Sequence, residues 1–365
     1  MPNNSVLQQD IETMLQQVVK LDVRIIGFQP LNRPDSVWVS RLTFVTSSGD
    51  TDTVIVKHIP APNYPISTQK TIPPTHAEEQ FIYQFLSGIR PAFDRFPHLL
   101  AYQPGLFMLE DLGTDSVKEQ PIEVLMESLA TTLAQLHGAT ANLYPRYQTM
   151  RQEAGIEADQ RMYSHQEQEH LFKIGTGLFY KYCDILGIDV TRCQEIFEQA
   201  RYAITNPGLF LALIHDDLAA ARQIVMVKNQ CYLVDFEMAK YGHILMDICK
   251  PLVGKFDRKG NTDYFILSHL DFPITFAGCY REKLESISGL SFDDATWNSS
   301  LNNALVYSTL VNCGALCCVS PAYKPLGGFM SLFKQLLQRL LILLVDNDNH
   351  RDLSPVLEDL TTRIV

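Results

Sequence analysis

The sequence predicts an α+β protein with two lobes, a small antiparallel β-rich N-terminal lobe and a larger, mainly helical C-terminal lobe. Three observations predict this fold class. Short β-rich runs separated by turn-forming clusters occupy residues 23–59, leucines at helical spacing begin at Leu125, and 365 residues exceed one minimal domain. We expect the boundary at about Gly113, which divides the chain into residues 1–112 and 113–365.

The N-terminal lobe is expected to begin with an amphipathic helix over about the first twenty residues, with Ser5 as its N-cap. A meander of three strands follows, because β-rich runs alternate with clusters of turn-forming residues. A helix and a further apolar strand complete this lobe. The expected strands and helix are Val23–Gln29, Val37–Thr46, Thr53–Ile59, His76–Ser87 and Leu106–Leu109.

The C-terminal lobe is expected to be helical on both sides of one different segment. Glu123–Ala139 carries a buried stripe of leucines, and further helices extend to about Arg201. The segment Leu211–Ile248 has short apolar runs that end in acidic residues. After Asp247 helices resume to the C-terminus, and Leu332–Val345 is the strongest apolar segment.

Composition excludes several classes of protein. The formal net charge of −11 and the lack of Lys/Arg clusters argue against a nucleic-acid binder. The longest apolar run, Leu340–Val345, is far too short to span a membrane, and the N-terminus does not resemble a signal peptide. Eight cysteines without a paired framework favour a cytoplasmic protein, and we expect Cys313, Cys317 and Cys318 to be core thiols rather than metal ligands.

Two acidic residues stand out in the segment Leu211–Ile248, eighteen residues apart. Asp217 follows an apolar run that ends in His215, and Asp235 ends the apolar run Tyr232–Val234. A carboxylate can position a hydroxyl nucleophile and accept its proton, which makes Asp217 the candidate general base. Hard cations select carboxylate oxygens, so Asp235 is the candidate magnesium ligand. We expect the ring of His215 to brace this loop, and Asp247 to accept hydrogen bonds from the loop backbone.

Lys57 ends an apolar strand, where an isolated buried charge would be costly. It could reach a bound anion with the help of a carboxylate from the following helix, and Glu79 suits that position better than Glu78. The alternative is a lysine at a sheet edge whose ammonium reaches water. Two acids at the start of a helix also favour the helix dipole without any further role.

The segment Leu106–Leu112 lies between the two expected lobes. An adenine ring needs a backbone donor, a backbone acceptor and an apolar slot, and an extended apolar segment offers all three. Glu110 and Leu112 are therefore candidate nucleotide-binding residues. The alternative is an ordinary core strand followed by an acidic turn.

Taken together, these features resemble the aminoglycoside phosphotransferase and choline kinase-like family. The resemblance covers about residues 23–250 and implies a bilobal protein-kinase-like fold, ATP and Mg²⁺ as cofactors, and phosphorylation of a hydroxyl of a small molecule. It also implies that the residues after Asp247 build a helical substrate-binding subdomain. The motifs that carry it are Val54–Lys57, Glu79, Leu109–Gly113, Leu133–Ala139, His215–Leu218, Leu233–Glu237 and Tyr241–Asp247.

The candidate catalytic loop departs from the family pattern at two positions. Asp216 stands where the family usually has glycine, and Arg222 stands at the metal-binding asparagine. Arginine offers only hydrogen-bond donors and a positive charge, so Arg222 cannot bind a metal ion. Three outcomes stay open. Gln223 could supply the missing amide oxygen, Arg222 could contact the ATP phosphates directly, or the site could have lost transfer activity.

The expected phosphate-covering loop, Pro30–Ser36, contains no glycine, which makes close approach of its backbone to phosphate harder. The Ser36 hydroxyl could donate a hydrogen bond to phosphate. Arg33 could compensate by charge or could be an exposed hairpin residue.

The sequence therefore predicts an ATP- and Mg²⁺-dependent kinase for a small-molecule hydroxyl. The alternative is a catalytically silent, kinase-like protein that binds a nucleotide or metabolite and serves a regulatory role. The acidic Asp216 and Glu237, together with the net charge, allow an amine-bearing acceptor.

Overall fold

The structure is a computed structural model. It describes residues 5–31, 38–58, 76–103, 105–113, 117, 120–156, 159–218, 221–258, 265–268, 270, 272–319, 326–344 and 350–364. The chain forms two compact units. Unit 1 comprises residues 1–116, 225–228 and 232–238, and unit 2 comprises residues 117–224, 229–231 and 239–365. Each unit is described by itself.

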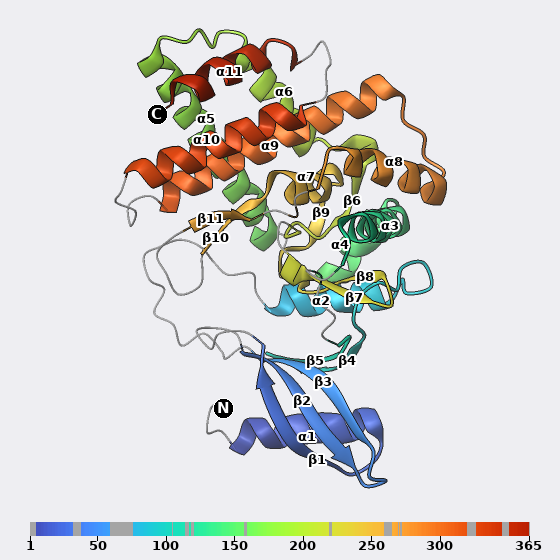
Figure 1. Ribbon diagram of the computed structural model, residues 1–365. Helices are drawn as coiled ribbons and strands as arrows, with labels where there is room; N and C mark the ends of the chain where they lie inside the picture. The colour runs from blue at the N-terminus through green and yellow to red at the C-terminus, as the bar shows by residue number, and fades with distance from the viewer. Residues whose placement is uncertain are drawn as a thin grey trace. The chain divides into compact units, whose positions relative to one another are not determined.

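Unit 1 is built on an antiparallel sheet of five strands in the order β1-β2-β3-β5-β4 (Figure 1). The register pairs Val56 of β3 with Ser40 of β2 and with Met108 of β5, so β3 lies at the centre of the sheet. The strands are β1 Val23–Pro30, β2 Trp38–Thr46, β3 Thr51–His58, β4 Leu99–Gln103 and β5 Leu106–Glu110. Strand β4 was not predicted; its short run, Leu99–Gln103, is mostly half-buried.

Helix α1, Ser5–Val19, packs across one face of this sheet and closes the hydrophobic core of unit 1 (Figure 1). Its buried Ile11, Met14 and Leu15 contact apolar side chains of β2, β3 and β5. Alternate residues of a strand point to opposite faces. With Val54 and Val56 in this core, Ile55 and Lys57 face the other side of the sheet.

Helix α2 spans His76–Ser87, the predicted range. Its buried face includes Phe81, Ile82 and Phe85, and Glu78 and Glu79 lie in its first turn. A β-hairpin from the middle of the chain, β7 Ile224–Val227 and β8 Gln230–Leu233, leads to the short 3₁₀ helix Phe236–Met238 (η4). Helix α2 packs against this 3₁₀ helix within unit 1.

Unit 2 is predominantly helical, as predicted. Helices α3 and α8 pack against each other, and α5 packs along α9. The helices are α3 Ile122–Thr140, α4 Tyr144–Glu153, α5 Asp159–Leu186, α6 Cys193–Thr205, α7 Leu245–Val253, α8 Thr275–Ser288, α9 Asp294–Val319, α10 Leu326–Leu343 and α11 Leu353–Arg363. Between α6 and α7 the short strands β6, Leu211–Ile214, and β9, Lys240–His243, pair antiparallel.

Two expectations for unit 2 are corrected. The segment after α7 was expected to be helical, but Lys255–Arg258 (β10) and Phe265–Ser268 (β11) form an antiparallel pair. The three clustered cysteines do lie on a helix, α9, but only Cys313 is fully buried. Cys317 is half-buried and Cys318 is exposed, because α9 turns them away from the core.

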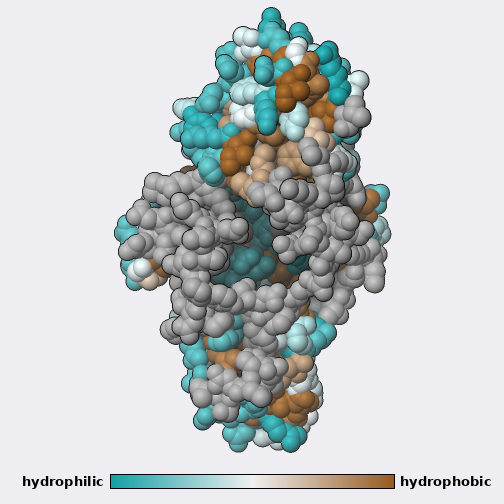
Figure 2. Space-filling view, turned by 90° about the vertical axis from the view of Figure 1, so that its left-hand side faces the viewer, coloured by the Kyte–Doolittle hydropathy of each residue, from teal (hydrophilic) through white to brown (hydrophobic). Residues whose placement is uncertain are grey.

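No helix among the described residues is both long and apolar enough to cross a membrane. On the face seen in Figure 2, hydrophobic side chains lie among hydrophilic ones over the visible described surface. Isolated exposed apolar residues of this kind include Ile185, Leu209 and Ile342 of unit 2.

The crossing of α5 and α9 depends on two buried glycines. A Cβ atom on Gly175 would lie 1.9 Å from the carbonyl oxygen of Leu310, and one on Gly314 would lie 1.9 Å from that of Leu171. Both contacts involve backbone, which cannot move aside as a flexible side chain can. The helices therefore approach as closely as they do because neither residue has a side chain.

We predict that Gly175→Ala lowers the free energy of unfolding by about 3 kcal/mol, because the added methyl group forces the helices apart. Gly177→Ala is the matched control on the same helix, since nothing lies within 4 Å of its added Cβ. That change should be neutral or stabilising by about 0.5–1 kcal/mol through helix propensity. Urea unfolding followed by circular dichroism measures both, and equal effects would contradict the proposed close crossing.

Candidate active site

Lys57 lies near the end of β3, opposite Phe107 of β5, and its side chain is only 7% exposed. Its Nζ atom is 2.5 Å from Oε2 of Glu79 and 2.7 Å from Oδ1 of Asp235. Of the two acids in the first turn of α2, Glu79 is thus the one that pairs with Lys57. The buried ammonium has two carboxylate partners and is not a lysine that reaches water.

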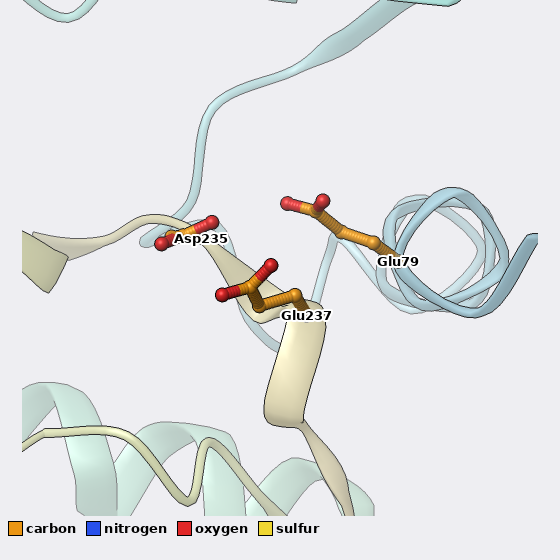
Figure 3. Close-up of side chains that lie close together, drawn as sticks. All are labelled: Glu79, Asp235 and Glu237. Carbon is orange, nitrogen blue, oxygen red and sulfur yellow. The ribbon is translucent and has the colours of Figure 1, made fainter. Parts of the chain in front are cut away.

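Three carboxylates gather around this ammonium. Figure 3 shows Glu79 on α2, Asp235 after β8 and Glu237 in the 3₁₀ helix, with their carboxylates directed toward one another. One oxygen of each lies within 4.8 Å of the others. Such a set of hard oxygen donors fits a divalent cation such as Mg²⁺. The side chain of Asp235 is 36% exposed and that of Glu79 only 3%, so Asp235 is the more accessible of these two to a ligand.

The excess of negative charge shifts the pKa values in this cluster. Burial by itself would lower the pKa of Lys57, but the carboxylates of Glu79, Asp235 and Glu237 outweigh burial and raise it. Burial raises the pKa of Glu79 to about 7, with Lys57 opposing and Asp235 adding to the rise. Three acids share one ammonium, so the most buried acid is the one that holds a proton most readily.

The backbone at Asp235 is left-handed, with φ of 66°, which is uncommon for a residue other than glycine. Its N–H group donates a hydrogen bond to the Tyr83 hydroxyl over 3.3 Å. The Tyr83 ring is fully buried between Phe107 and Phe236, at centroid distances of 6.0 and 5.5 Å. Tyr83 thereby helps to hold Asp235 in its unusual conformation.

The expected nucleotide hinge follows β5. Arg41 of β2 binds the Asp111 carboxylate with two nitrogens and donates a further hydrogen bond to the Gly113 carbonyl. Glu110 accepts a hydrogen bond from the backbone N–H of His98, and Leu112 is half-buried. The bidentate ion pair holds this segment against β2. A role of Glu110 or Leu112 in nucleotide binding stays a prediction.

In unit 2 one buried carboxylate accepts hydrogen bonds from the backbone of the candidate catalytic loop. Asp247 of α7 accepts hydrogen bonds from the backbone N–H groups of His215 and Asp216, each at 2.7 Å. The expected structural role of Asp247 is confirmed. His137 of α3 lies 3.2 Å from Asp247, and its other ring nitrogen lies 2.7 Å from the Tyr280 hydroxyl.

Asp217 and Gln223, which are six positions apart in the sequence, are brought together. The amide nitrogen of Gln223 donates a hydrogen bond of 2.8 Å to Oδ2 of Asp217. Gln223 is fully buried, and its amide oxygen, Oε1, accepts no hydrogen bond from the residues that the structure describes. A buried acceptor without a protein partner is usually satisfied by a water molecule, an ion or a ligand. Arg222, the neighbouring residue, is exposed.

Asp216 is held on every side. Its backbone is left-handed, with φ of 59°, and its side chain has no exposure. The carboxylate lies 2.6 Å from Nζ of Lys240 and 3.4 Å from Nζ of Lys250, and it accepts a 2.7 Å hydrogen bond from Gln168. Burial would raise the pKa of Asp216, but the two lysines and Gln168 outweigh it and hold that pKa well below its ordinary range.

These contacts correct one expectation from the sequence. Asp216 was a candidate for binding an amine of the acceptor. Its carboxylate is fully buried and already neutralised by Lys240 and Lys250, so it is not available to an amine. Two other predicted positions, Ser36 and Arg33, lie outside the described residues.

No family model matches the sequence, and no curated protein matches it. A choline kinase from Cryptosporidium parvum has a similar structure, with a TM-score of 0.53 and 12% sequence identity over 91% of this chain and 95% of that one. An aminoglycoside phosphotransferase from Alicyclobacillus acidocaldarius is similar with a TM-score of 0.52 and 12% identity, over 94% of this chain and 95% of that one.

The chain has the fold of these kinases. The predicted resemblance to the aminoglycoside phosphotransferase and choline kinase-like family is thus confirmed at the level of the fold. Identity of 12% carries no residue roles across, and the roles proposed below depend on the contacts of this chain.

Sequence reasoning missed several residues that the structure brings to the two clusters. A buried lysine in the apolar run before Tyr241 was a signal that could have identified Lys240, because such a lysine needs an acidic partner. Tyr83, Gln168 and Arg41 gave no comparable signal. Each makes its contact with a residue far away in the sequence, at separations that no local pattern encodes.

We predict that the free energy of unfolding of the metal-free protein falls as the pH rises from 4.5 to 8, and that the loss of the Glu79 proton causes part of this fall. The folded protein binds the Glu79 proton more tightly than the unfolded chain, where this group titrates near 4.5. The free energy of unfolding therefore falls as the pH rises from 4.5 through about 7, by up to about 3 kcal/mol for this group.

Glu79→Gln replaces the ionisable carboxyl group by a neutral amide and should remove this part of the pH dependence. Urea unfolding of both proteins in EDTA at pH 5, 6, 7 and 8 measures the difference between them. A difference that stays constant over this range would show that the pKa of Glu79 is not raised.

Proposed function

We propose that this protein is an ATP- and Mg²⁺-dependent phosphotransferase that acts on a hydroxyl group of a small molecule. The observation that carries the proposal is the buried Lys57 ammonium shared between Glu79 and Asp235, in a protein with the fold of known kinases. One cation beside two acids is the set of groups that binding of a phosphate and a metal ion would use. The proposed division of labour assigns nucleotide binding to residues 1–112 and the acceptor to residues 113–365.

Lys57 would bind the α- and β-phosphates, while Glu79 keeps its side chain extended. Asp235 and Glu237 of unit 1 would hold Mg²⁺. The role of the Gln223 amide oxygen as a metal ligand stays a prediction from the sequence. A bound Mg²⁺ supplies charge neutralisation to the phosphate oxygens. Glu110 and Leu112 would contact the adenine through the segment after β5. A hydrogen bond from Ser36 to phosphate stays part of the proposal.

Asp217 would orient the acceptor hydroxyl and take its proton. The hydroxyl oxygen attacks the γ-phosphorus, the new O–P bond forms as the bond to the β,γ-bridging oxygen breaks, and ADP leaves with that electron pair. The proton passes from the hydroxyl to the Asp217 carboxylate. The hydrogen bond from Gln223 fixes one oxygen of Asp217.

The contacts of Gln223 favour one of the three outcomes that Arg222 leaves open. Gln223 has a buried oxygen with no partner in the described residues, which is what replacement of the missing asparagine requires. Arg222 is exposed and would meet the phosphates through its guanidinium donors.

The acceptor is proposed only as a small molecule with a hydroxyl group. The kinases with similar structures act on choline and on aminoglycosides, both of which carry cationic nitrogen. With Asp216 neutralised and Glu237 assigned to Mg²⁺, neither of the two acids that the sequence offered for an amine is available to it. We therefore propose a panel of neutral, anionic and amine-bearing alcohols as test acceptors.

We predict that ATP with Mg²⁺ raises the melting temperature of the wild-type protein and that Lys57→Met weakens this binding at least about tenfold, because a charge-assisted contact to phosphate is lost. Lys20→Met is the control, since Lys20 is exposed and belongs to the same unit. Thermal shift against ATP concentration measures both, after circular dichroism confirms folding. No stabilisation of the wild type at millimolar ATP would contradict the proposed function.

We predict that Asp217→Asn lowers ATP-dependent phosphorylation of any acceptor found in the panel by about 10²–10⁴-fold with little change in ATP affinity, because the proton acceptor is removed. Product formation measured by mass spectrometry, alongside the thermal shift, tests this. Unchanged turnover would exclude Asp217 as the base. ATP binding with no turnover on any acceptor would instead support the catalytically silent alternative.

A further inference from the structure

We propose that Lys240 is a positioning residue that acts through Asp216, and that their buried ion pair sets the direction of the Asp217 carboxylate. The proposal deepens the proposed function, because it rests on Asp217 as the base. It also concerns a physical arrangement that can be measured without any turnover.

The ion pair arises where β9 runs beside β6. Ile214, the last residue of β6, pairs with Lys240, the first residue of β9, so Lys240 is placed next to the loop that leaves β6. Its ammonium is 2.6 Å from the Asp216 carboxylate, and the two side chains are 4% and 0% exposed. Neither charge can reach water, so each is compensated inside the protein, with Lys250 as a second cation for Asp216.

The backbone of Asp216 is constrained by the same contacts. Residues with a Cβ rarely adopt φ of 59°, and aspartate does so only with support from its surroundings. Here Asp247 holds the backbone N–H, while Lys240 and Gln168 hold the side chain. A glycine in this position would be free to rotate, whereas Asp216 is fixed at both ends.

The next residue in the chain is Asp217, whose direction follows from the backbone of Asp216. Its carboxylate meets the Gln223 amide at 2.8 Å. A rotation at residue 216 would separate these two groups. Lys250 is a second cation, 3.4 Å from the other carboxylate oxygen of Asp216. Burial lowers the pKa of Lys250, but Asp216 and Asp217 outweigh burial and raise it.

The test uses Asp216→Asn, Lys240→Met and the double variant in the full-length protein. Each single change leaves a buried charge with weaker compensation, and we expect the melting temperature to fall by roughly 10 °C. The double variant removes both charges at similar volume and should recover most of this loss. Lys173→Met, an exposed lysine of unit 2, is the control and should change nothing.

Positioning is measured through the side-chain amide signal of Gln223 in ¹⁵N-glutamine-labelled protein. Gln223→Leu identifies the signal, and Asp217→Ala shows where it lies without its hydrogen bond. We expect the signal of the double variant to stay displaced toward that of Asp217→Ala even though stability has recovered. A double variant with the wild-type signal would overturn the proposal, because the ion pair would then serve stability alone.

Turnover provides a second readout once an acceptor is known. We expect the double variant to lose at least about tenfold in kcat with unchanged affinity for ATP, as for a displaced catalytic group. Full recovery of kcat with stability would also overturn the proposal. If the wild type shows no turnover at all, the proposed function fails, while the Gln223 signal still decides the positioning role.

Gln168→Leu is a second variant that tests the proposal if the double variant does not fold. Gln168 is only half-buried and neutral, so its loss leaves no uncompensated charge. We expect this variant to fold and to displace the Gln223 signal by a smaller amount in the same direction. An unmoved signal in Gln168→Leu would count against the proposal on its own.

Discussion

The burial of the Lys57 ammonium is the constraint on which unit 1 depends. The Lys57 side chain is only 7% exposed, so its charge needs acidic side chains in contact with it. Those acids come from α2 and from the turn after β8. The pairing therefore joins a sheet, a helix and a hairpin that are far apart in the sequence. Because three acids surround one cation, the cluster keeps an excess of negative charge that a divalent cation can neutralise.

Unit 2 also buries charged side chains, but here the buried charges at the centre are negative. Hydrogen-bond donors and lysines surround these carboxylates. Asp247 is satisfied by backbone N–H groups and by His137, and Asp216 by two lysines and a glutamine. In both units the backbone at one aspartate of the candidate site is left-handed, and a polar contact from a distant residue supports it.

The sequence predicted those parts of the fold that are encoded locally. The range of α2 and the leucine stripe of α3 follow from hydrophobic periodicity, which reports burial directly. The choice of Glu79 over Glu78 was likewise accessible from helical register.

What the sequence did not reveal depends on contacts between distant residues. The mostly half-buried β4 and the pair β10–β11 gain their structure from neighbouring strands rather than from their own pattern. The role of Asp216 was misjudged for the same reason, because its exposure could not be known without Lys240 and Lys250.

The ion pair of Asp216 and Lys240 also constrains how such a loop can arise. In the family that the sequence resembles, glycine usually occupies position 216, and a single-nucleotide change converts a glycine codon to an aspartate codon. A glycine at this position would leave Lys240 and Lys250 without their shared carboxylate, and loss of Lys240 would leave Asp216 with Lys250 alone. Replacement of either residue by itself is therefore the unfavourable step, and the two positions are expected to change together.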